Sequence, residues 1–236
     1  MTFNLIGIGL NAKSLTLESL EAIKKSKKIY LDNYTIDFPY DTKKLEKVVS
    51  KKIEKLSREK IESEEILKIA KKENVSLLIY GDSLSATTHI HLISICKKNK
   101  IPYKIFHSSS ILTAVAETGL EIYKFGKTTS LPTWKDNWKP DSFIEIIKKN
   151  LSIKAHTLLL VDIGLELKKT KKQLQESLTK NNLALNKIIL CSNLGNKNQK
   201  IIYNTLENLP EKITKPYCLI IPSELHFLEK EFLEKI

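Results

Sequence analysis

The stretch Gly81-Asp82-Ser83-Leu84-Ser85-Ala86-Thr87-Thr88-His89 decides the fold. It follows the apolar run Val75–Tyr80, whose length and branched and aromatic content are typical of a buried strand. A mostly apolar helix is expected from Ile90 onwards. Gly81 then follows the carboxyl end of a strand, which is where open parallel sheets bind ligands. The alternative is an ordinary strand-to-helix turn in which one of the two threonines caps the helix.

Strands and helices alternate on both sides of this stretch. Apolar runs predict strands at 3–8, 28–31, 53–56 and 103–107, with helices between them. Such alternation is typical of a mostly parallel α/β sheet. The second half repeats the alternation, with strands expected at 157–163, 187–191 and 218–222, and with residues 201–206 open to either state. The chain is therefore predicted to be an α/β protein with two α/β domains, 1–108 and 109–236.

The residues Gly7-Ile8-Gly9-Leu10-Asn11-Ala12 fit the dinucleotide-binding pattern GxGxxG/A, and Asp32 follows at about the required 20 residues. That pattern requires a helix to begin at its last position, so that the helix N-terminus faces a pyrophosphate. Here the helix is expected to begin later, with Thr16 as its N-cap. The sequence therefore argues against a dinucleotide at this turn.

Composition and charge exclude several classes of protein. No apolar run approaches the roughly 20 residues of a membrane span, and the N-terminus lacks a signal-peptide pattern, so a cytoplasmic protein is expected. The net charge of +12 favours a nucleic-acid-binding protein, but Arg58 is the only arginine and the lysines are spread along every helix. We interpret the lysines as solvated faces. Attraction to an acidic protein or to ribosome-associated material is the alternative.

The sequence contains neither a metal site nor a recognisable catalytic triad. Three cysteines (Cys96, Cys191 and Cys218) are far apart and are expected to be buried thiols. His89 and His91 are two residues apart, so on a helix they point to different faces and do not share a metal. Capping or packing is expected of both.

The remaining polar candidates are also expected to be structural. The serines 108–110 lack the G-x-S-x-G nucleophile elbow and are expected to cap a helix or to form a polar rim. His156 precedes a strand and reads as a loop residue. His226 follows the carboxyl end of a predicted strand, and from the residues alone a structural role is expected for it too.

Three stretches, in this order, resemble the diphthine synthase family. They are Ile6-Gly7-Ile8-Gly9-Leu10, the stretch from Gly81 to His89, and Thr118-Gly119-Leu120-Glu121-Ile122-Tyr123-Lys124-Phe125-Gly126-Lys127-Thr128. Ser83 and Ser85 stand where the family usually has proline and valine. The resemblance is dense up to Trp138 and thinner in the last third of the chain.

The resemblance implies an S-adenosylmethionine-dependent methyltransferase of diphthamide biosynthesis, with a tetrapyrrole-methylase-like fold and the cofactor in the interdomain cleft. The implied acceptor is the amino group of the 3-amino-3-carboxypropyl-histidine of elongation factor 2. The short chain resembles archaeal-type members, which stop at a trimethylated nitrogen. A homodimer is implied, without a membrane, nucleic acid or metal. The implied cofactor contacts are Leu10, Asp82, Ser85, Ser110, Ile111, Val161, Leu194 and His226.

The sequence shows no recognisable general acid or base, which is consistent with methyl transfer from a sulfonium. In that reaction the methyl group is already activated and the protein mainly aligns the reactants. No dedicated base is predicted, so solvent or a bound water is expected to take the proton of the amine. Two alternatives stay open. One is a methylase of a small tetrapyrrole of the precorrin or uroporphyrinogen type, and the other is a basic, non-catalytic protein that binds RNA or ribosomes.

Overall fold

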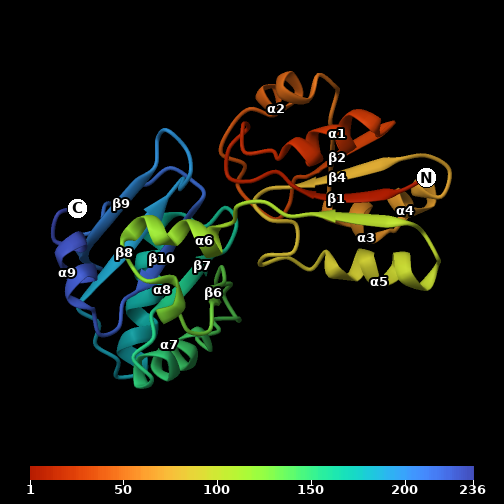
Figure 1. Ribbon diagram of the computed structural model, residues 1–236. Coiled ribbons are helices and arrows are strands. Elements are labelled where there is room, and N and C mark those ends of the chain that lie inside the picture. The colour runs from red at the N-terminus through yellow and green to blue at the C-terminus, as the bar shows by residue number, and fades with distance from the viewer. The chain divides into compact units, whose positions relative to one another are not determined.

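The computed structural model describes residues 1–236, which form two compact units, Met1–Leu112 and Thr113–Ile236. Each unit contains one five-stranded sheet with helices (Figure 1). The α/β fold expected from the sequence is confirmed. The sequence predicts a division after residue 108, whereas the structure divides the chain after Leu112, within the short helix α6 (Ile111–Ala114).

The sheet of the first unit has the strand order β3-β2-β4-β1-β5, and every neighbouring pair is parallel. All five strands therefore end at the same edge of the sheet. The strands occur where the apolar runs predict them: β1 (Phe3–Gly7), β2 (Lys28–Asp32), β3 (Glu54–Leu56), β4 (Val75–Ile79) and β5 (Tyr103–Phe106).

Helices cover both faces of this sheet (Figure 1). α1 (Leu17–Lys25) and α2 (Thr42–Val49) pack on one face, and α3 (Arg58–Glu62), α4 (Glu65–Ala70) and α5 (Ile90–Lys98) pack on the other. α1 begins as predicted, because the hydroxyl of Thr16 accepts a hydrogen bond of 3.1 Å from the backbone N–H of Ser19. The turn after β1 is therefore too long for the dinucleotide-binding pattern.

The stretch from Gly81 to His89 is a loop between β4 and α5. Neither threonine caps α5, whose N-cap is His89 and carries no side-chain capping bond. The hydroxyl of Thr87 instead donates to the carbonyl oxygen of Ser83 at 3.1 Å. The loop is thus held by contacts of its own, and the threonine-cap interpretation is wrong.

The sheet of the second unit has the order β6-β7-β10-β8-β9. Only β6 and β7 are parallel, and the other three pairings are antiparallel. Alternating elements thus do not give a parallel sheet here, because β8 and β9 pair directly and β10 inserts between β7 and β8. The strands are β6 (Thr129–Leu131), β7 (Thr157–Val161), β8 (Lys187–Ser192), β9 (Lys200–Thr205) and β10 (Tyr217–Ile221).

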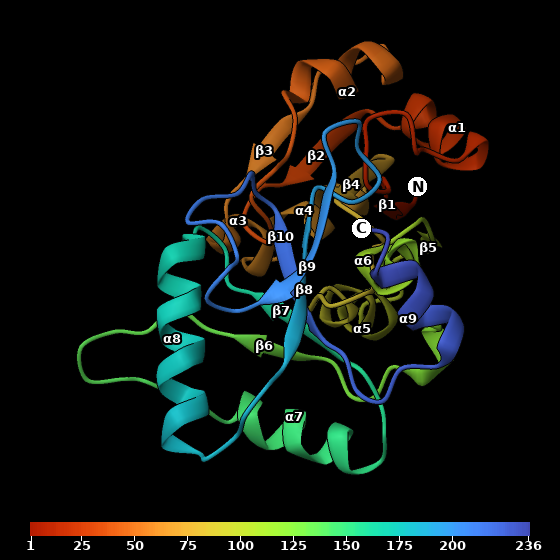
Figure 2. The ribbon, with the colours of Figure 1, turned by 90° about the vertical axis from the view of Figure 1, so that its left-hand side faces the viewer.

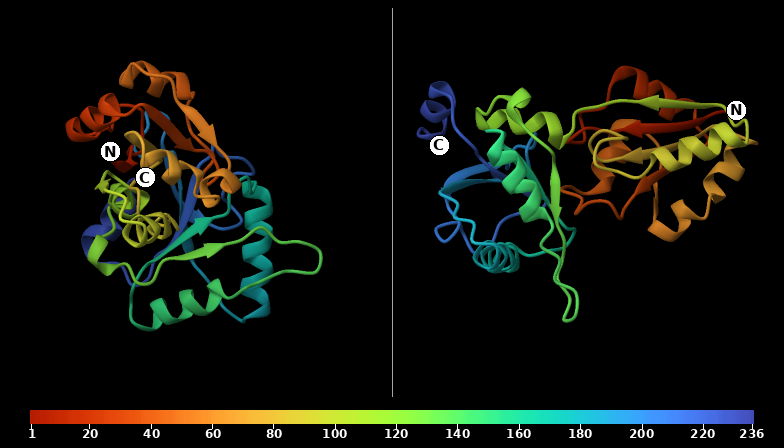
Figure 3. Two further views of the ribbon diagram at one scale, coloured as in Figure 1. Left: turned by 90° about the vertical axis from the view of Figure 1, so that its right-hand side faces the viewer. Right: turned by 90° about the horizontal axis from the view of Figure 1, so that it is seen from below.

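Three longer helices belong to this sheet: α7 (Phe143–Ser152), α8 (Leu167–Lys180) and α9 (Phe227–Leu233). α7 and α8 share one apolar cluster with the sheet, and α8 and α9 lie on opposite sides of it (Figure 2). Two short 3-10 segments, Val115–Thr118 and Ile122–Lys124, follow α6. Between β6 and α7 the chain projects as a long loop (Figure 3).

The three cysteines are free and buried, as predicted from their apolar surroundings. The structure contains no group of three or more His, Cys, Asp or Glu side chains arranged to hold a metal ion. None of its helices combines the length and apolar character that crossing a membrane requires.

Candidate functional site

Three neighbouring strands of the first unit, β4, β1 and β5, end in polar loops at one edge of the sheet. Gly9 and Gly81 follow β1 and β4, and their backbones exchange two hydrogen bonds of 3.0 Å each. Both have positive φ angles, +69° and +77°, which favour glycine. A Cβ atom on Gly9 would lie 2.3 Å from the Cβ of Ser14. The loops therefore meet backbone to backbone at this edge.

Asp82 ties these loops together. Its Oδ1 accepts hydrogen bonds from the backbone N–H of Leu84 at 2.9 Å and the hydroxyl of Ser85 at 3.3 Å. Its Oδ2 accepts one from the backbone N–H of Ser108 at 3.0 Å and contacts Nδ1 of His107 at 2.9 Å. One buried carboxylate thus holds the loop after β4 against the loop after β5.

These donors also set the charge of Asp82. Burial acts to raise the pKa of this carboxyl, but the hydrogen bonds from Leu84, Ser108 and His107 together outweigh burial and hold the pKa below its usual range. The side chain is therefore an anion at neutral pH. Its negative charge lies where a positively charged ligand would be stabilised.

The residues that the resemblance implies for cofactor binding in this unit come together at this edge. The carbonyl oxygen of Leu10 accepts a hydrogen bond of 2.7 Å from the hydroxyl of Tyr80. The hydroxyl of Ser110 accepts from the N–H of Leu112 at 3.2 Å, and a Cβ on Gly81 would lie 3.8 Å from the Cα of Ser110. Leu10, Asp82, Ser85 and Ser110 therefore surround the two glycines, with Ile111 next in the chain.

The second unit separates its three implied residues. Val161 ends β7, and Leu194 is buried just beyond the end of β8. Both strands are antiparallel to β10, so they run in the same direction and their carboxyl ends share one edge. Val161 and Leu194 are therefore at the same edge of this sheet.

His226 lies at the opposite edge of that sheet. It follows the carboxyl end of β10 as the sequence predicts, but Ile221 pairs with Thr157 at the start of β7. Its backbone N–H donates to Oε2 of Glu229 at 2.7 Å, and Glu229 in turn contacts Nε2 of His156 at 3.1 Å. The antiparallel direction of β10 is the physical reason why His226 is not grouped with Val161.

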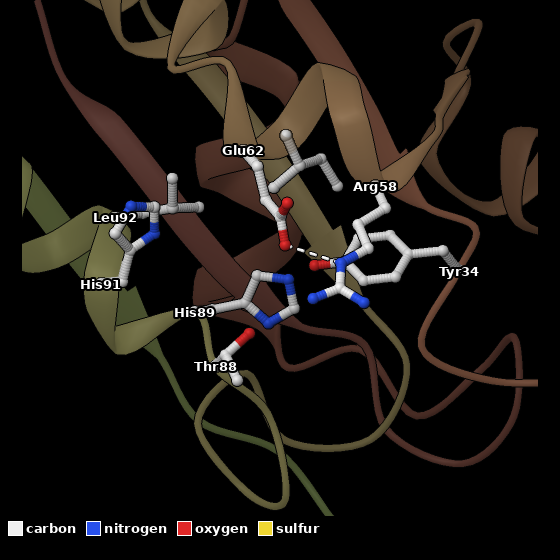
Figure 4. Close-up of a pocket in the computed structure, with 8 residues that line it drawn as sticks. Tyr34, Arg58, Glu62, Thr88, His89, His91 and Leu92 are labelled. Carbon is white, nitrogen blue, oxygen red and sulfur yellow. Dashed lines mark hydrogen bonds and ion pairs between the residues drawn. The ribbon is translucent and has the colours of Figure 1, made fainter. Parts of the chain in front are cut away.

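A second feature of the first unit was missed by sequence reasoning. A cavity of about 360 Å³ lies beyond the ends of β2 and β3, beside the first turns of α3 and α5 (Figure 4). Its polar lining comes from Tyr34, Arg58, Glu62, Thr88, His89 and His91. Asp32, which the sequence shows only as part of a misleading nucleotide pattern, lies directly behind His89 at 3.0 Å.

The chain is similar to known methylases. Residues 2–210 match the family of tetrapyrrole (corrin/porphyrin) methylases. The diphthine methyl ester synthase of Schizosaccharomyces pombe is 35% identical, over 98% of this chain and 93% of the relative. The chain belongs to the diphthine synthase family of tetrapyrrole methylases.

Two other relatives agree with this placement. A crystal structure named as a putative diphthine synthase from Entamoeba histolytica has a TM-score of 0.90 at 31% identity, covering 99% of this chain and 97% of that chain. The diphthine methyl ester synthase of Saccharomyces cerevisiae is 42% identical over 76% of this chain. In that case the matched region is 59% of the relative's own length.

Membership of this methylase family confirms the methyltransferase expected from the sequence, and it argues against a non-catalytic binding protein. It also implies a methyl donor of the S-adenosylmethionine type. The first-unit edge fits such a donor, because Gly81 leaves the rim without a side chain and Asp82 supplies a fixed anion near it. The sequence pattern locates these residues, whereas the cavity beside His89 needed the tertiary structure.

Proposed function

We propose that this chain transfers methyl groups from S-adenosylmethionine to the 3-amino-3-carboxypropyl-histidine of elongation factor 2, in diphthamide biosynthesis. One observation carries the proposal: the loop of the family motif at Gly81–His89 is fixed to the loop after β5 by Asp82 and to the loop after β1 by the Gly9–Gly81 backbone bonds. The names of the relatives, which are diphthine methyl ester synthases, supply the substrate class.

The donor supplies a methyl group that is already activated on a sulfonium, and it leaves as S-adenosylhomocysteine. The proposal assigns its binding in the first unit to Leu10, Asp82, Ser85, Ser110 and Ile111. Val161, Leu194 and His226 of the second unit are contacts that the resemblance alone implies. Within the first unit, Asp82 acts by ordering the loop, since its oxygens already accept several hydrogen bonds. The backbone and the serine hydroxyls then position the donor.

The extent of methylation is the point at which sequence and relatives differ. Resemblance to archaeal-type members predicts a stop after three methyl groups on the nitrogen. The relatives from Schizosaccharomyces pombe and Saccharomyces cerevisiae are named for a methyl ester, which requires a further methyl on the carboxylate oxygen. These names favour a four-methyl product, and we include carboxylate methylation in the proposal.

The test is the mass of elongation factor 2 after exhaustive reaction. Factor that carries the unmethylated precursor is incubated with the chain and excess S-adenosylmethionine, and the modified peptide is weighed. Four added methyl groups support ester formation, and three support the archaeal-type product. Factor in which the target histidine is replaced is the control and should gain none. An unchanged mass of the precursor under all conditions would contradict the proposed function.

Two further points belong to the proposal. A homodimer is proposed from the family resemblance, and Trp138, 53% exposed in the loop after β6, is a candidate contact. A cytoplasmic location follows from the acceptor, because elongation factor 2 works on cytoplasmic ribosomes. The net charge of +12 gives the chain a general attraction for acidic surfaces of a protein partner.

A further inference from the structure

A buried pair of a histidine and a carboxylate lies beside the cavity in the first unit. Nε2 of His89 lies 3.0 Å from Oδ2 of Asp32, and the two side chains are 1% and 0% exposed. Asp32 is fixed in turn by the backbone N–H of Tyr34 at 2.9 Å and by the backbone N–H and hydroxyl of Thr35 at 3.2 and 2.9 Å. The carboxylate is therefore held in place behind the imidazole, on the side away from the cavity.

The imidazole itself is not satisfied. Nδ1 of His89 has no hydrogen-bond partner, and the contact of Nε2 with Asp32 is close in distance but not aligned as a hydrogen bond. A buried polar group without a partner is unfavourable for the folded state. His89 lines the cavity together with the hydroxyl-bearing Thr88 and Tyr34 (Figure 4). A polar hydrogen brought against Nδ1 would recover that cost.

The cavity lies at the same edge of the sheet as the proposed donor site. β4 pairs with β1 on one side and with β2 on the other, and all three strands end at the same edge. The loop after β4 begins with Asp82, which orders the donor edge, and ends with His89, which lines the cavity. A single loop thus connects the proposed donor site to an unsatisfied base.

We propose that this cavity receives the amino-acid end of the acceptor and that Nδ1 of His89 is the base that takes the proton of its ammonium group. The inference rests on the proposed function, since it concerns the same methyl transfer. It replaces the expectation that solvent alone removes this proton.

The transfer conserves atoms and electrons. The ammonium nitrogen gives one proton to Nδ1 of His89, which becomes an imidazolium stabilised by the Asp32 carboxylate. The freed lone pair then forms the N–C bond to the methyl group while the C–S bond of the donor breaks, with its electron pair going to sulfur. The imidazolium releases its proton to solvent before the next transfer.

Arg58 gives the cavity a second recognition element. Its Nε donates to Oε1 of Glu62 at 2.7 Å, which holds the guanidinium at the wall of the cavity (Figure 4). Its terminal N–H groups suit a carboxylate, because a guanidinium binds carboxylates with two parallel hydrogen bonds. The acceptor carries a carboxylate beside its amine, so an arginine and a base in one cavity match both groups.

The kinetic test is single-turnover methylation of elongation factor 2 at saturating donor. His89→Asn keeps a polar group near the position of Nδ1 but removes the base, and we expect the rate at pH 7 to fall by about 10²-fold. The loss should shrink as the pH approaches the amine's own pKa, because solvent then supplies the neutral amine. Imidazole added to His89→Ala should restore part of the rate.

Other groups that face His89 must be separated from it in the pH profile. They are Asp32 at the end of β2, Tyr34 just beyond it, Arg58 and Glu62 on α3, and His91 on α5. Asp32→Asn should lower the rate less than His89→Asn and keep a pH-dependent loss, because it removes only the charge that stabilises the imidazolium. Neither Arg58→Lys nor His91→Asn should respond to imidazole.

The matched control is His156→Asn. His156 is also a buried histidine beside a carboxylate, but its Nδ1 accepts from the N–H of Ser223 at 2.9 Å and its Nε2 contacts Glu229 at 3.1 Å. Its role is structural, so the variant should lower the melting temperature but leave the single-turnover rate and its pH profile unchanged. S-adenosylhomocysteine binding by calorimetry confirms that each variant is folded.

A binding test does not depend on activity. 2-Aminobutyrate, which has the amino-acid end of the acceptor, is titrated into the donor-free protein while the ring resonances of labelled histidines are followed by NMR. Shifts of the His89 resonances without shifts of the His156 resonances would support binding of the amino-acid group in the cavity. If the parent methylates elongation factor 2 and His89→Asn matches its rate at every pH, or if the probe leaves His89 unshifted, the inference is overturned. Failure of the parent to methylate contradicts the proposed function instead, while the probe still tests the cavity.

Discussion

The backbone of Gly9 donates a hydrogen bond of 3.0 Å to the carbonyl of Gly81, and the N–H of Gly81 donates one of equal length back to Gly9. The two residues are 72 positions apart in sequence and join the ends of two neighbouring parallel strands. Their positive φ angles make this reciprocal pair a position for glycine. The proposed donor-binding edge is built on it.

Gly81→Val should abolish donor binding while most of the fold persists. The φ of +77° strains any side chain, and a β-branched residue most of all. A Cβ there would itself make only ordinary contacts, at 3.8 Å from Ser109 and Ser110, so the damage falls on the loop and on the space for a ligand. Calorimetry with S-adenosylhomocysteine measures the loss.

Gly164→Ala, compared with Gly81→Ala, controls for strain alone. Gly164 has a φ of +76°, and no atom lies within 4 Å of the position that a Cβ would take there. Both alanines therefore carry the same backbone penalty of about 1–2 kcal/mol. Only Gly81→Ala should weaken donor binding. Equal affinities in the two variants would make Gly81 a simple turn residue.

Asp82→Asn should lower both stability and donor affinity. The amide retains one acceptor oxygen for Leu84 but presents an NH₂ group to the backbone N–H of Ser108. The loss of this buried bond is expected to cost about 1–3 kcal/mol. Urea unfolding and calorimetry should show both losses together. Asp41→Asn is the control. Asp41 is the exposed N-cap of α2 and accepts a hydrogen bond of 2.9 Å from the backbone N–H of Lys43. In this variant stability should change little and donor affinity should not change at all.

Glu229 should make the second unit sensitive to acid. Burial acts to raise its pKa, but hydrogen bonds from Glu121, Lys124, His226 and His156 outweigh burial and lower the pKa from 4.5 to about 2. A depressed carboxyl pKa stabilises the fold above the unfolded value and loses that contribution as the pH falls from about 4.5 towards 2. Burial lowers the pKa of His156 and outweighs the opposing effect of Glu229. Because the unfolded chain then binds a proton more readily than the fold does, His156 also makes the fold less stable as the pH falls below about 6.5.

Glu229→Gln should therefore be less stable than the parent at pH 7 and should lose less stability between pH 4.5 and pH 2. Urea unfolding across this range measures both effects. Glu224→Gln is the matched control, since Glu224 is exposed and pairs with Lys154 at 2.7 Å on the surface. Its profile should follow the parent. A Glu229→Gln curve parallel to the parent's would show that the buried carboxyl does not control acid unfolding.

The proposed homodimer predicts a dimeric mass in light scattering at micromolar concentration. Trp138 is exposed in the loop after β6, whereas the indole N–H of Trp134 donates to the carbonyl of Pro140 at 3.1 Å. Trp138→Ser should weaken association with little effect on the melting temperature, because about half of the residue is exposed. A monomeric mass for the parent would contradict the dimer.

The sequence by itself determined the elements of the first unit and the edge at which its motif residues meet. Periodic apolar runs identified its five strands, and the Thr16 cap excluded the dinucleotide pattern. The family motifs pointed to Leu10, Asp82 and Ser110, whose role in donor binding stays a prediction. This worked because the β-α alternation of that unit gives parallel strands, whose carboxyl ends necessarily meet at one edge. Local pattern and global geometry carry the same information there.

Only the tertiary structure decided the strand order of the second unit and the surroundings of His89. Periodicity predicts a strand at 218–222, and the structure places it at Tyr217–Ile221. Periodicity does not show that this strand runs antiparallel between β7 and β8, which separates His226 from Val161. The contact of Asp32 with His89 likewise joins residues on β2 and before α5. Strand pairing and side-chain contacts of this kind depend on long-range packing, and local hydrophobic patterns do not encode their partners.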